Sequence, residues 1–363
     1  MKRALCTALA AVMLASTLFG CAPAEPATTP EPTPEPTDTY KEITEINSTL
    51  YSEDTLMFKV GDSEVYWPEL LYWICSHVIA MTRGYQLDWS TVYNETDTIQ
   101  DFIMDASVDA VSLYRTVEVK AAEMGVSLSE QDMDEIESEF ESAKALAGGE
   151  EAFNEELGSS QLTQELYRYL LKISTLYYKL FVELCGESAE KYSDSDAISY
   201  ANENGYMMAK HILLLSKEDE TENNEVKADM EAILSELKAA GGGEALFTKF
   251  DELMNARSED AGGLMSYPGG YLFREGDMVA EFFAATMALD EGELSEIVET
   301  NYGYHIILRL PVDPDSLIFN TPYPLRYTAA YASFESLAQQ WRDEAEIVPT
   351  KELDEINFSD IFK

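Results

Sequence analysis

The chain has 363 residues, enough for two domains with a sizeable core. Its 24 Lys and Arg oppose 68 Asp and Glu, a formal net charge of -44, so it repels phosphate backbones and we exclude nucleic acid as a partner. Because 46% of the residues are hydrophobic and 11% aromatic, disorder throughout is excluded as well. Its four cysteines have no zinc-ligand spacing. We expect neither a metal nor a cofactor.

Residues 1–21 have the pattern of an export signal. A positive start, Lys2-Arg3, precedes the apolar stretch Ala4–Phe19, which is too short to span a bilayer comfortably. It ends in Leu18-Phe19-Gly20-Cys21, which resembles the lipobox of bacterial lipoproteins. That resemblance implies lipidation of Cys21 and a chain held on the outer face of the bacterial cytoplasmic membrane. A plain secretory signal or a transmembrane anchor is the alternative.

Residues 22–40 predict a disordered, proline-rich linker. Six prolines fall between positions 22 and 36, interleaved with Thr, Ala and Glu. Such a segment stays in extended polyproline II and packs against nothing. Fifteen residues at about 3.1 Å each give a spacer of roughly 45 Å.

Residues 41–202 predict a mainly helical domain. The expected elements are a short strand at Met57–Asp62, a helix from Pro68, a helical stripe from Ile99 to Met124 closed by Gly125, a helix capped by Ser129 and Asp132 and broken at Gly148-Gly149, and a long helix from Thr163 to Leu184. Several aromatic residues here either line a cradle for unfolded chains or belong to the core: Tyr66, Trp67, Tyr72, Trp73, Tyr167, Tyr169, Tyr177 and Tyr178. Cys75 and Cys185 are expected to be buried thiols, with a disulfide between them as the alternative, and His77 to be structural.

A unit with a different sequence pattern follows at residues 203–312. Strand-like runs, Met207–Leu215 and Gly303–Leu310, enclose helices and short turn-rich segments. Residues 313–363 return to a helical pattern, with one helix from Tyr327 to Ala345, and are expected to complete the first domain. The fold class predicted is α+β: a split, mostly helical domain with a small antiparallel sheet surrounded by helices inserted in it.

Five segments of the inserted unit, in order, resemble the parvulin-type peptidyl-prolyl isomerases. They are Ala209–Leu213, Ser258–Asp260, Gly276–Phe282, Gly292–Ser295 and Val298–Ile307. The resemblance implies that His211 and His305 are paired active-site histidines in a hydrogen-bond network with Thr300. It further implies a catalytic position for Asp260 and a substrate-binding surface built from Met278, Phe282, Leu272 and Tyr302. For the polar residues a purely structural role is the alternative.

Phosphate-specific parvulins carry basic residues after the first strand, whereas Ser216–Asp229 holds two lysines against six acids. A phosphoserine would be repelled, so unphosphorylated Xaa-Pro bonds are the expected substrate.

The helical flank resembles the chaperone part of PrsA-like and SurA-like foldases, through Phe58–Asp62, Ala121–Val126 and Gly148–Phe153. The leading hypothesis is therefore a lipid-anchored foldase that isomerises Xaa-Pro bonds in newly exported polypeptides. The alternatives are a non-catalytic holdase with a degenerate parvulin unit and a solute-binding lipoprotein; the latter predicts two similar α/β lobes.

Overall fold

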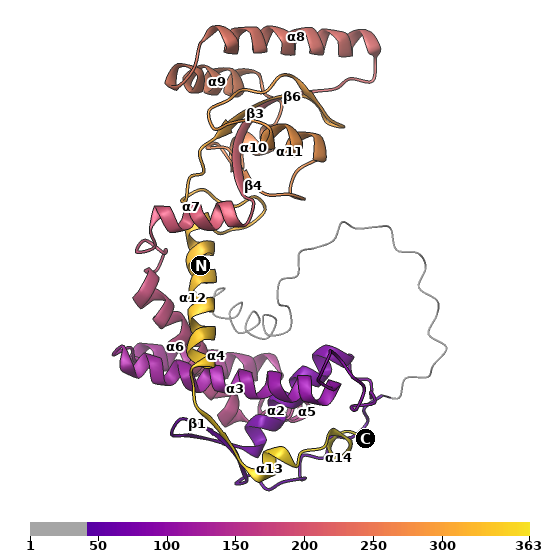
Figure 1. Ribbon diagram of the computed structural model, residues 1–363, viewed down its shortest axis with the longest axis vertical. Coiled ribbons are helices and arrows are strands. Elements are labelled where there is room, and N and C mark those ends of the chain that lie inside the picture. The colour runs from indigo at the N-terminus through magenta and orange to yellow at the C-terminus, as the bar shows by residue number, and fades with distance from the viewer. Residues whose placement is uncertain (1–41) are drawn as a thin grey trace. The chain divides into compact units, whose positions relative to one another are not determined.

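The computed structural model describes residues 42–363 (Figure 1). The signal, the lipidation of Cys21 and the whole linker lie outside the described residues. Contacts divide the described chain into two compact units. Unit 1 is made of residues 42–183 and Glu335–Lys363, and unit 2 is made of Leu184–Phe334. The second unit is thus inserted in the first, as the sequence predicts.

Unit 1 contains a three-stranded antiparallel sheet, in the order β2-β1-β7. Strands β1 (Leu56–Val60) and β2 (Ser63–Tyr66) form a hairpin whose turn uses Gly61 at φ 56°, a left-handed conformation that favours glycine. Strand β7 (Ile347–Pro349) pairs with β1 from a distant part of the sequence. The hairpin strand was predicted, but β7 was not, because three exposed residues carry no alternation.

Four helices of unit 1 begin and end close to where the sequence predicts: α2 (Trp67–Thr82), α3 (Ile99–Glu123), α4 (Glu130–Leu146) and α6 (Gln164–Cys185). Helices α5 (Glu150–Ser159), α13 (Lys351–Asp354) and α14 (Phe358–Ile361) were not predicted from the sequence. Ser129 and Asp132 form a complete capping box on α4, which satisfies backbone groups at its first turn. Gly148 and Gly149, at φ 100° and 116°, separate α4 from α5.

Most large aromatic side chains of unit 1 belong to its core. Trp67, Tyr72, Trp73 and Tyr177 are all buried, and the Trp67 indole donates to the Ser48 carbonyl over 2.7 Å. They therefore have little surface to offer an unfolded client, which favours the core interpretation of these four. Cys75 is buried and free, and burial raises the pKa of its thiol to about 12.

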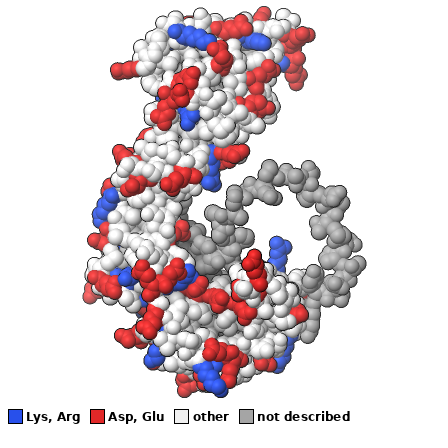
Figure 2. Space-filling model, in the orientation of Figure 1, with Lys and Arg blue, Asp and Glu red and all other residues white. Residues whose placement is uncertain are grey.

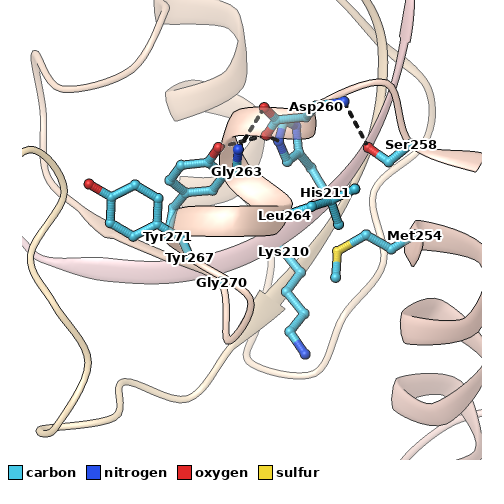
Figure 3. A pocket seen from close by; sticks show the side chains of 10 residues that line it. All are labelled: Lys210, His211, Met254, Ser258, Asp260, Gly263, Leu264, Tyr267, Gly270 and Tyr271. Carbon is cyan, nitrogen blue, oxygen red and sulfur yellow. Dashed lines mark hydrogen bonds and ion pairs between the residues drawn. The ribbon is translucent and has the colours of Figure 1, made fainter.

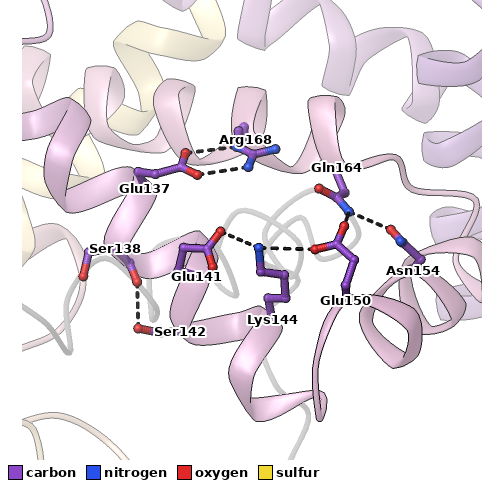
Figure 4. A network of polar contacts seen from close by, with 9 residues as sticks. All are labelled: Glu137, Ser138, Glu141, Ser142, Lys144, Glu150, Asn154, Gln164 and Arg168. Atoms are coloured by element: carbon purple, nitrogen blue, oxygen red, sulfur yellow. Dashed lines mark hydrogen bonds and ion pairs between the residues drawn. The ribbon is translucent and has the colours of Figure 1, made fainter.

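A polar network joins α4, α5 and α6 on the surface of unit 1 (Figure 4). Arg168 makes two 3.0 Å bonds to Glu137, while its guanidinium lies 3.4 Å from the centre of the Phe140 ring. Lys144 bridges Glu141 and Glu150. The long side chains of Lys144 and Arg168 both cover the ring of Phe140 and pair with neighbouring acids. Elsewhere acids dominate: Figure 2 shows more Asp and Glu than Lys and Arg on the visible face.

Unit 2 is built on a four-stranded antiparallel sheet, in the order β4-β3-β6-β5. Its strands are β3 (Met207–Leu215), β4 (Tyr271–Phe273), β5 (Val298–Glu299) and β6 (Gly303–Leu310). Its helices are α7 (Asp194–Glu203), α8 (Glu220–Ala239), α9 (Glu244–Arg257), α10 (Ala261–Ser266), α11 (Ala280–Met287) and the beginning of α12 (Leu325–Asp343), which ends in unit 1. This is the small antiparallel sheet with helices that the sequence predicts.

The two faces of this sheet have different partners. Ile212, Leu214, Ile306 and Leu308 face α8 and α9 and form the larger core cluster. The alternate residues of β3 and β6 face α11, where Met207, Ala209 and Ile307 pack with Phe273 and Phe282. Because side chains alternate along a strand, both predicted histidines fall on this second face, beside α11.

The inserted unit is wider than the expected 203–312. Ala201 of α7 and Leu325 of α12 are fully buried in a cluster with Met208 and Leu272, so both helices complete the sheet's packing. Arg326 then fastens the two connections: it bonds Asp194, Asp315 and the Tyr192 carbonyl, each at 2.7 Å. The unit's incoming and outgoing segments are held by one side chain.

Candidate functional site

His211 and His305 meet on the face of the sheet that carries α11. His305 lies opposite Leu213 in the β3–β6 register, so the two histidines are diagonal neighbours. Their rings are nearly parallel, with centroids 5.2 Å apart, and the two Nδ1 atoms are 2.9 Å apart, a hydrogen-bond distance. His305 is buried, and burial together with the neighbouring His211 lowers the pKa of His305 to about 4.

Asp260 anchors one end of this pair from the start of α10 (Figure 3). Its Oδ2 lies 2.7 Å from His211 Nε2 and accepts a hydrogen bond from the Tyr271 hydroxyl over 2.6 Å, while Oδ1 accepts from the Gly263 amide over 3.0 Å. The bond from His211, helped by those from Tyr271 and Gly263, holds the pKa of Asp260 well below its usual range, against the opposing effect of burial. Asp260 is therefore a carboxylate at neutral pH.

Thr300 anchors the other end, at the end of the turn-side strand β5. Its Oγ1 is 2.8 Å from His305 Nε2 and accepts a hydrogen bond from the Tyr302 amide over 3.1 Å. The four side chains Asp260, His211, His305 and Thr300 thus form one continuous hydrogen-bonded chain.

The direction of this chain follows from Asp260, since a carboxylate can only accept. His211 must then carry a proton on Nε2. If both imidazoles are neutral, the bare Nδ1 of His211 accepts from His305 Nδ1–H. The bare Nε2 of His305 accepts from the Thr300 hydroxyl. Assigned this way, every donor meets an acceptor with both imidazoles neutral, which agrees with the low pKa of His305.

An apolar surface adjoins the histidine pair. The Phe282 ring stands edge-on to both imidazoles, at centroid distances of 5.2 Å to His211 and 5.6 Å to His305. Met278 is partly buried and packs in the same cluster as Phe282. Phe282 itself is only 3% exposed, so it supports this surface from below rather than standing free on it.

Two of the residues expected at the substrate surface, Leu272 and Tyr302, do not belong to the cluster that holds Met278 and Phe282. Leu272 is fully buried in the cluster with Met208 and Leu325, on the face of the sheet opposite to Phe282, because Tyr271 and Phe273 take the site face of β4. We therefore leave Leu272 out of the proposed surface. Tyr302 is 57% exposed in the β5–β6 turn, and only its backbone amide contacts the hydrogen-bonded chain, by donating to Thr300 Oγ1.

Tyr271 is the residue that sequence reasoning missed. It lies between two of the five segments that carry the resemblance, so no motif pointed to it. The signal available in the sequence was the pair Gly269-Gly270, which predicts a turn directly before it. In the structure Gly270 has φ 113° and the chain enters β4 at Tyr271. Its ring stands edge-on to His211 at 5.5 Å while its hydroxyl reaches Asp260.

The arrangement provides oriented polar groups, one of them the Asp260 carboxylate, beside an apolar surface. Among residues 42–363 no group of three or more His, Cys, Asp or Glu side chains could hold a metal ion. Within the same residues no helix is both long and apolar enough to cross a membrane.

Comparison with known proteins identifies the sheet unit. Residues 211–310 match the family model Rotamase, described as a PPIC-type PPIASE domain. The match begins at the first histidine of the pair and includes Asp260, Thr300 and His305, so the hydrogen-bonded chain lies wholly inside it.

Curated relatives are named foldase protein PrsA. That of Clostridium perfringens is 23% identical over 197 residues, covering 52% of this chain and 53% of the relative, and that of Oceanobacillus iheyensis is 29% identical over 198 residues, covering 54% and 58%. The chain therefore spans about half the length of the curated relatives it matches. Among solved structures, PrsA of Bacillus subtilis is 22% identical, with 73% of this chain and 97% of that chain covered and a TM-score of 0.26. At such a TM-score nothing about function follows from that likeness.

Proposed function

We propose that this chain, whose residues 211–310 form a PPIC-type parvulin domain, is an extracytoplasmic foldase that isomerises Xaa-Pro peptide bonds in unfolded polypeptides. One observation carries the proposal: the hydrogen-bonded chain from Asp260 through His211 and His305 to Thr300, lying against Phe282.

The chemistry of the reaction fits such a site. Rotation about a peptide bond has a barrier of about 18–20 kcal/mol, because amide resonance gives the C–N bond partial double-bond character. That resonance form is charge-separated, so water favours the planar amide. Surroundings that are apolar and neutral favour the twisted amide instead, and each 1.4 kcal/mol removed from the barrier gives about a tenfold rate.

Each side chain then has a proposed role. Met278 contacts the proline ring, and Phe282 supports that contact. The histidine pair, held between Asp260 and Thr300, presents a fixed polar environment to the rotating carbonyl and transfers no proton.

Unphosphorylated substrates are the better fit. Asp219 caps α8 by accepting from the amides of Thr221 and Glu222, and it lies in an exposed acidic stretch with Glu218 and Glu220. A dianionic phosphoserine would approach these carboxylates without a cation cluster to pair with. The lipid anchor at Cys21 and attachment to the membrane rest on the sequence alone and belong to this proposal.

The test is a protease-coupled isomerase assay with tetrapeptides that vary the residue before proline. Met278→Ala should lower kcat/KM about tenfold or more, since it removes most of the surface offered to the ring. Met133→Ala is the matched control, because Met133 lies on α4 of unit 1 and is 38% exposed. An unaccelerated reaction with the unsubstituted protein would refute the proposed activity.

A non-catalytic holdase is the second candidate, and the burial of Phe282 favours it. A ring that is 3% exposed offers little contact area to a proline. Suppression of client aggregation by a protein that does not accelerate isomerisation would establish this alternative.

A further inference from the structure

We infer that Tyr271 is a positioning residue of this site, whose hydroxyl orients Asp260 and thereby fixes the tautomers of His211 and His305. The inference rests on the proposed function for its catalytic consequence, whereas the tautomers themselves can be observed without any reaction.

The hydroxyl of Tyr271 shares a single acceptor atom with His211. Both groups bond Asp260 Oδ2, at 2.6 Å from Tyr271 and 2.7 Å from His211 Nε2. Tyr271 reaches this atom from β4, His211 from β3, and the Gly263 amide holds the other oxygen from α10. Three elements thus converge on one carboxylate, and removing a donor frees it to rotate about its last bond.

The local backbone is shaped for this contact. A Cβ at position 263 would collide with both the Tyr271 hydroxyl and Asp260 Oδ2. Glycine at 263 therefore allows the amide, the carboxylate and the hydroxyl to approach together. The half-buried Tyr271 also keeps its proton, because burial and the adjacent Asp260 carboxylate both raise the pKa of Tyr271.

The orientation of Asp260 matters because it sets which group donates and which accepts in every hydrogen bond from Asp260 to Thr300. With Asp260 held as acceptor and both imidazoles neutral, only one arrangement of protons satisfies both histidines and Thr300. Once Asp260 rotates or takes up a proton, His211 can present either nitrogen, and the polar environment of the substrate carbonyl is no longer unique. Tyr271 thus acts on the histidine pair through its hydrogen bond to Asp260.

The first test compares Tyr271→Phe with Tyr267→Phe in the full chain. Tyr267 stacks 4.9 Å from Tyr271, but its hydroxyl accepts a hydrogen bond from the Asn320 amide and makes no contact with Asp260, so it is a matched control. We expect kcat/KM of Tyr271→Phe to fall on the order of tenfold, the typical worth of one hydrogen bond to a charged acceptor. The acid limb of its pH profile should move to higher pH, because Asp260 keeps only His211 and Gly263 as donors. Equal effects of the two substitutions, or an unmoved profile, would overturn the inference.

A double-substitution cycle tests the route. In an Asp260→Asn background, Tyr271→Phe should have no further effect on kcat/KM, since the carboxylate it orients is gone. Additive losses would show that Tyr271 acts by another path.

The second test needs no activity. The chain has three histidines, so long-range proton–nitrogen NMR of 15N-histidine-labelled full chain yields few signals. At pH 7 we expect His211 protonated on Nε2 and His305 on Nδ1, with averaged nitrogen shifts for His211 in Tyr271→Phe and sharp ones in Tyr267→Phe. An inactive protein with these tautomers and this response refutes the proposed function alone. An active protein whose tautomers ignore Tyr271→Phe refutes this inference alone.

Discussion

Replacing Phe282 by alanine should lower the free energy of unfolding of unit 2 as well as impair the site. The ring is 3% exposed and packs with Met207, Phe273 and Ile307 as well as with both histidines. Buried Phe→Ala substitutions cost about 3–5 kcal/mol, from lost transfer energy and the cavity left behind. A loss of about 4 kcal/mol is a large part of the 5–15 kcal/mol typical of one domain. Phe282→Ala should therefore lower stability as well as activity.

The fluorophores allow a clean assay. All four tryptophans, Trp67, Trp73, Trp89 and Trp341, belong to unit 1. In urea unfolding, tryptophan fluorescence therefore follows unit 1, while the histidine NMR signals of His211 and His305 follow unit 2. Phe282→Ala should move only the second transition.

The partly buried Met278 provides the comparison. Met278→Ala should cost only about 1–2 kcal/mol, because less of the side chain leaves a packed environment. Loss of under 1 kcal/mol in Phe282→Ala, or an equal shift of the tryptophan transition, would refute this account of the packing.

Three further predictions concern charge. His305 binds a proton near pH 6.5 in the unfolded chain but only near pH 4 in the folded one, so the free energy of unfolding falls as pH drops through this window. The loss should reach about 3 kcal/mol. It is measured as the difference from a His305→Asn variant, in which the carboxylates that both proteins share titrate in the same way. Glu69→Ala should cost unit 1 about 1.5–3 kcal/mol in tryptophan-detected unfolding, because Arg115, whose side chain is 12% exposed, then keeps only the longer 3.5 Å pair with Glu118. Glu355→Ala, which removes an exposed pair with Lys351 in the same unit, should leave that stability unchanged. Arg326→Met should lower the stability of unit 2 by about 1–2 kcal/mol, measured by the histidine signals, since its acidic partners are largely solvated; an unchanged midpoint would contradict the fastening role.

Regular elements were predictable where local chemistry decides them. The strand Met207–Leu215 and the strand Gly303–Leu310 have the expected bounds, and the Ser129 capping box begins its helix as expected. Continuous apolar runs and capping residues act over a few positions, so one sequence suffices to recognise them.

Features set by distant partners were not predictable. Strand β7 exists because β1 offers it an edge, and Tyr271 matters because a turn elsewhere brings Asp260 to its hydroxyl. Which face of the sheet Leu272 lies on also depends on the register of β4 with β3. A shift of one residue would move every side chain of β4 to the other face. No motif within a single segment carries this information.

The pairing of β1 with β7 orders events during synthesis. The bond from Thr350 Oγ1 to Met57 O joins residues 293 positions apart, whereas every strand of the inserted sheet lies between Met207 and Leu310. The inserted unit can therefore complete its sheet while unit 1 still lacks a strand, and its folding shortens the loop that β7 must close. A nascent chain interrupted before residue 347 would carry a finished site on a domain with an open sheet edge, a natural target for proteolysis and aggregation.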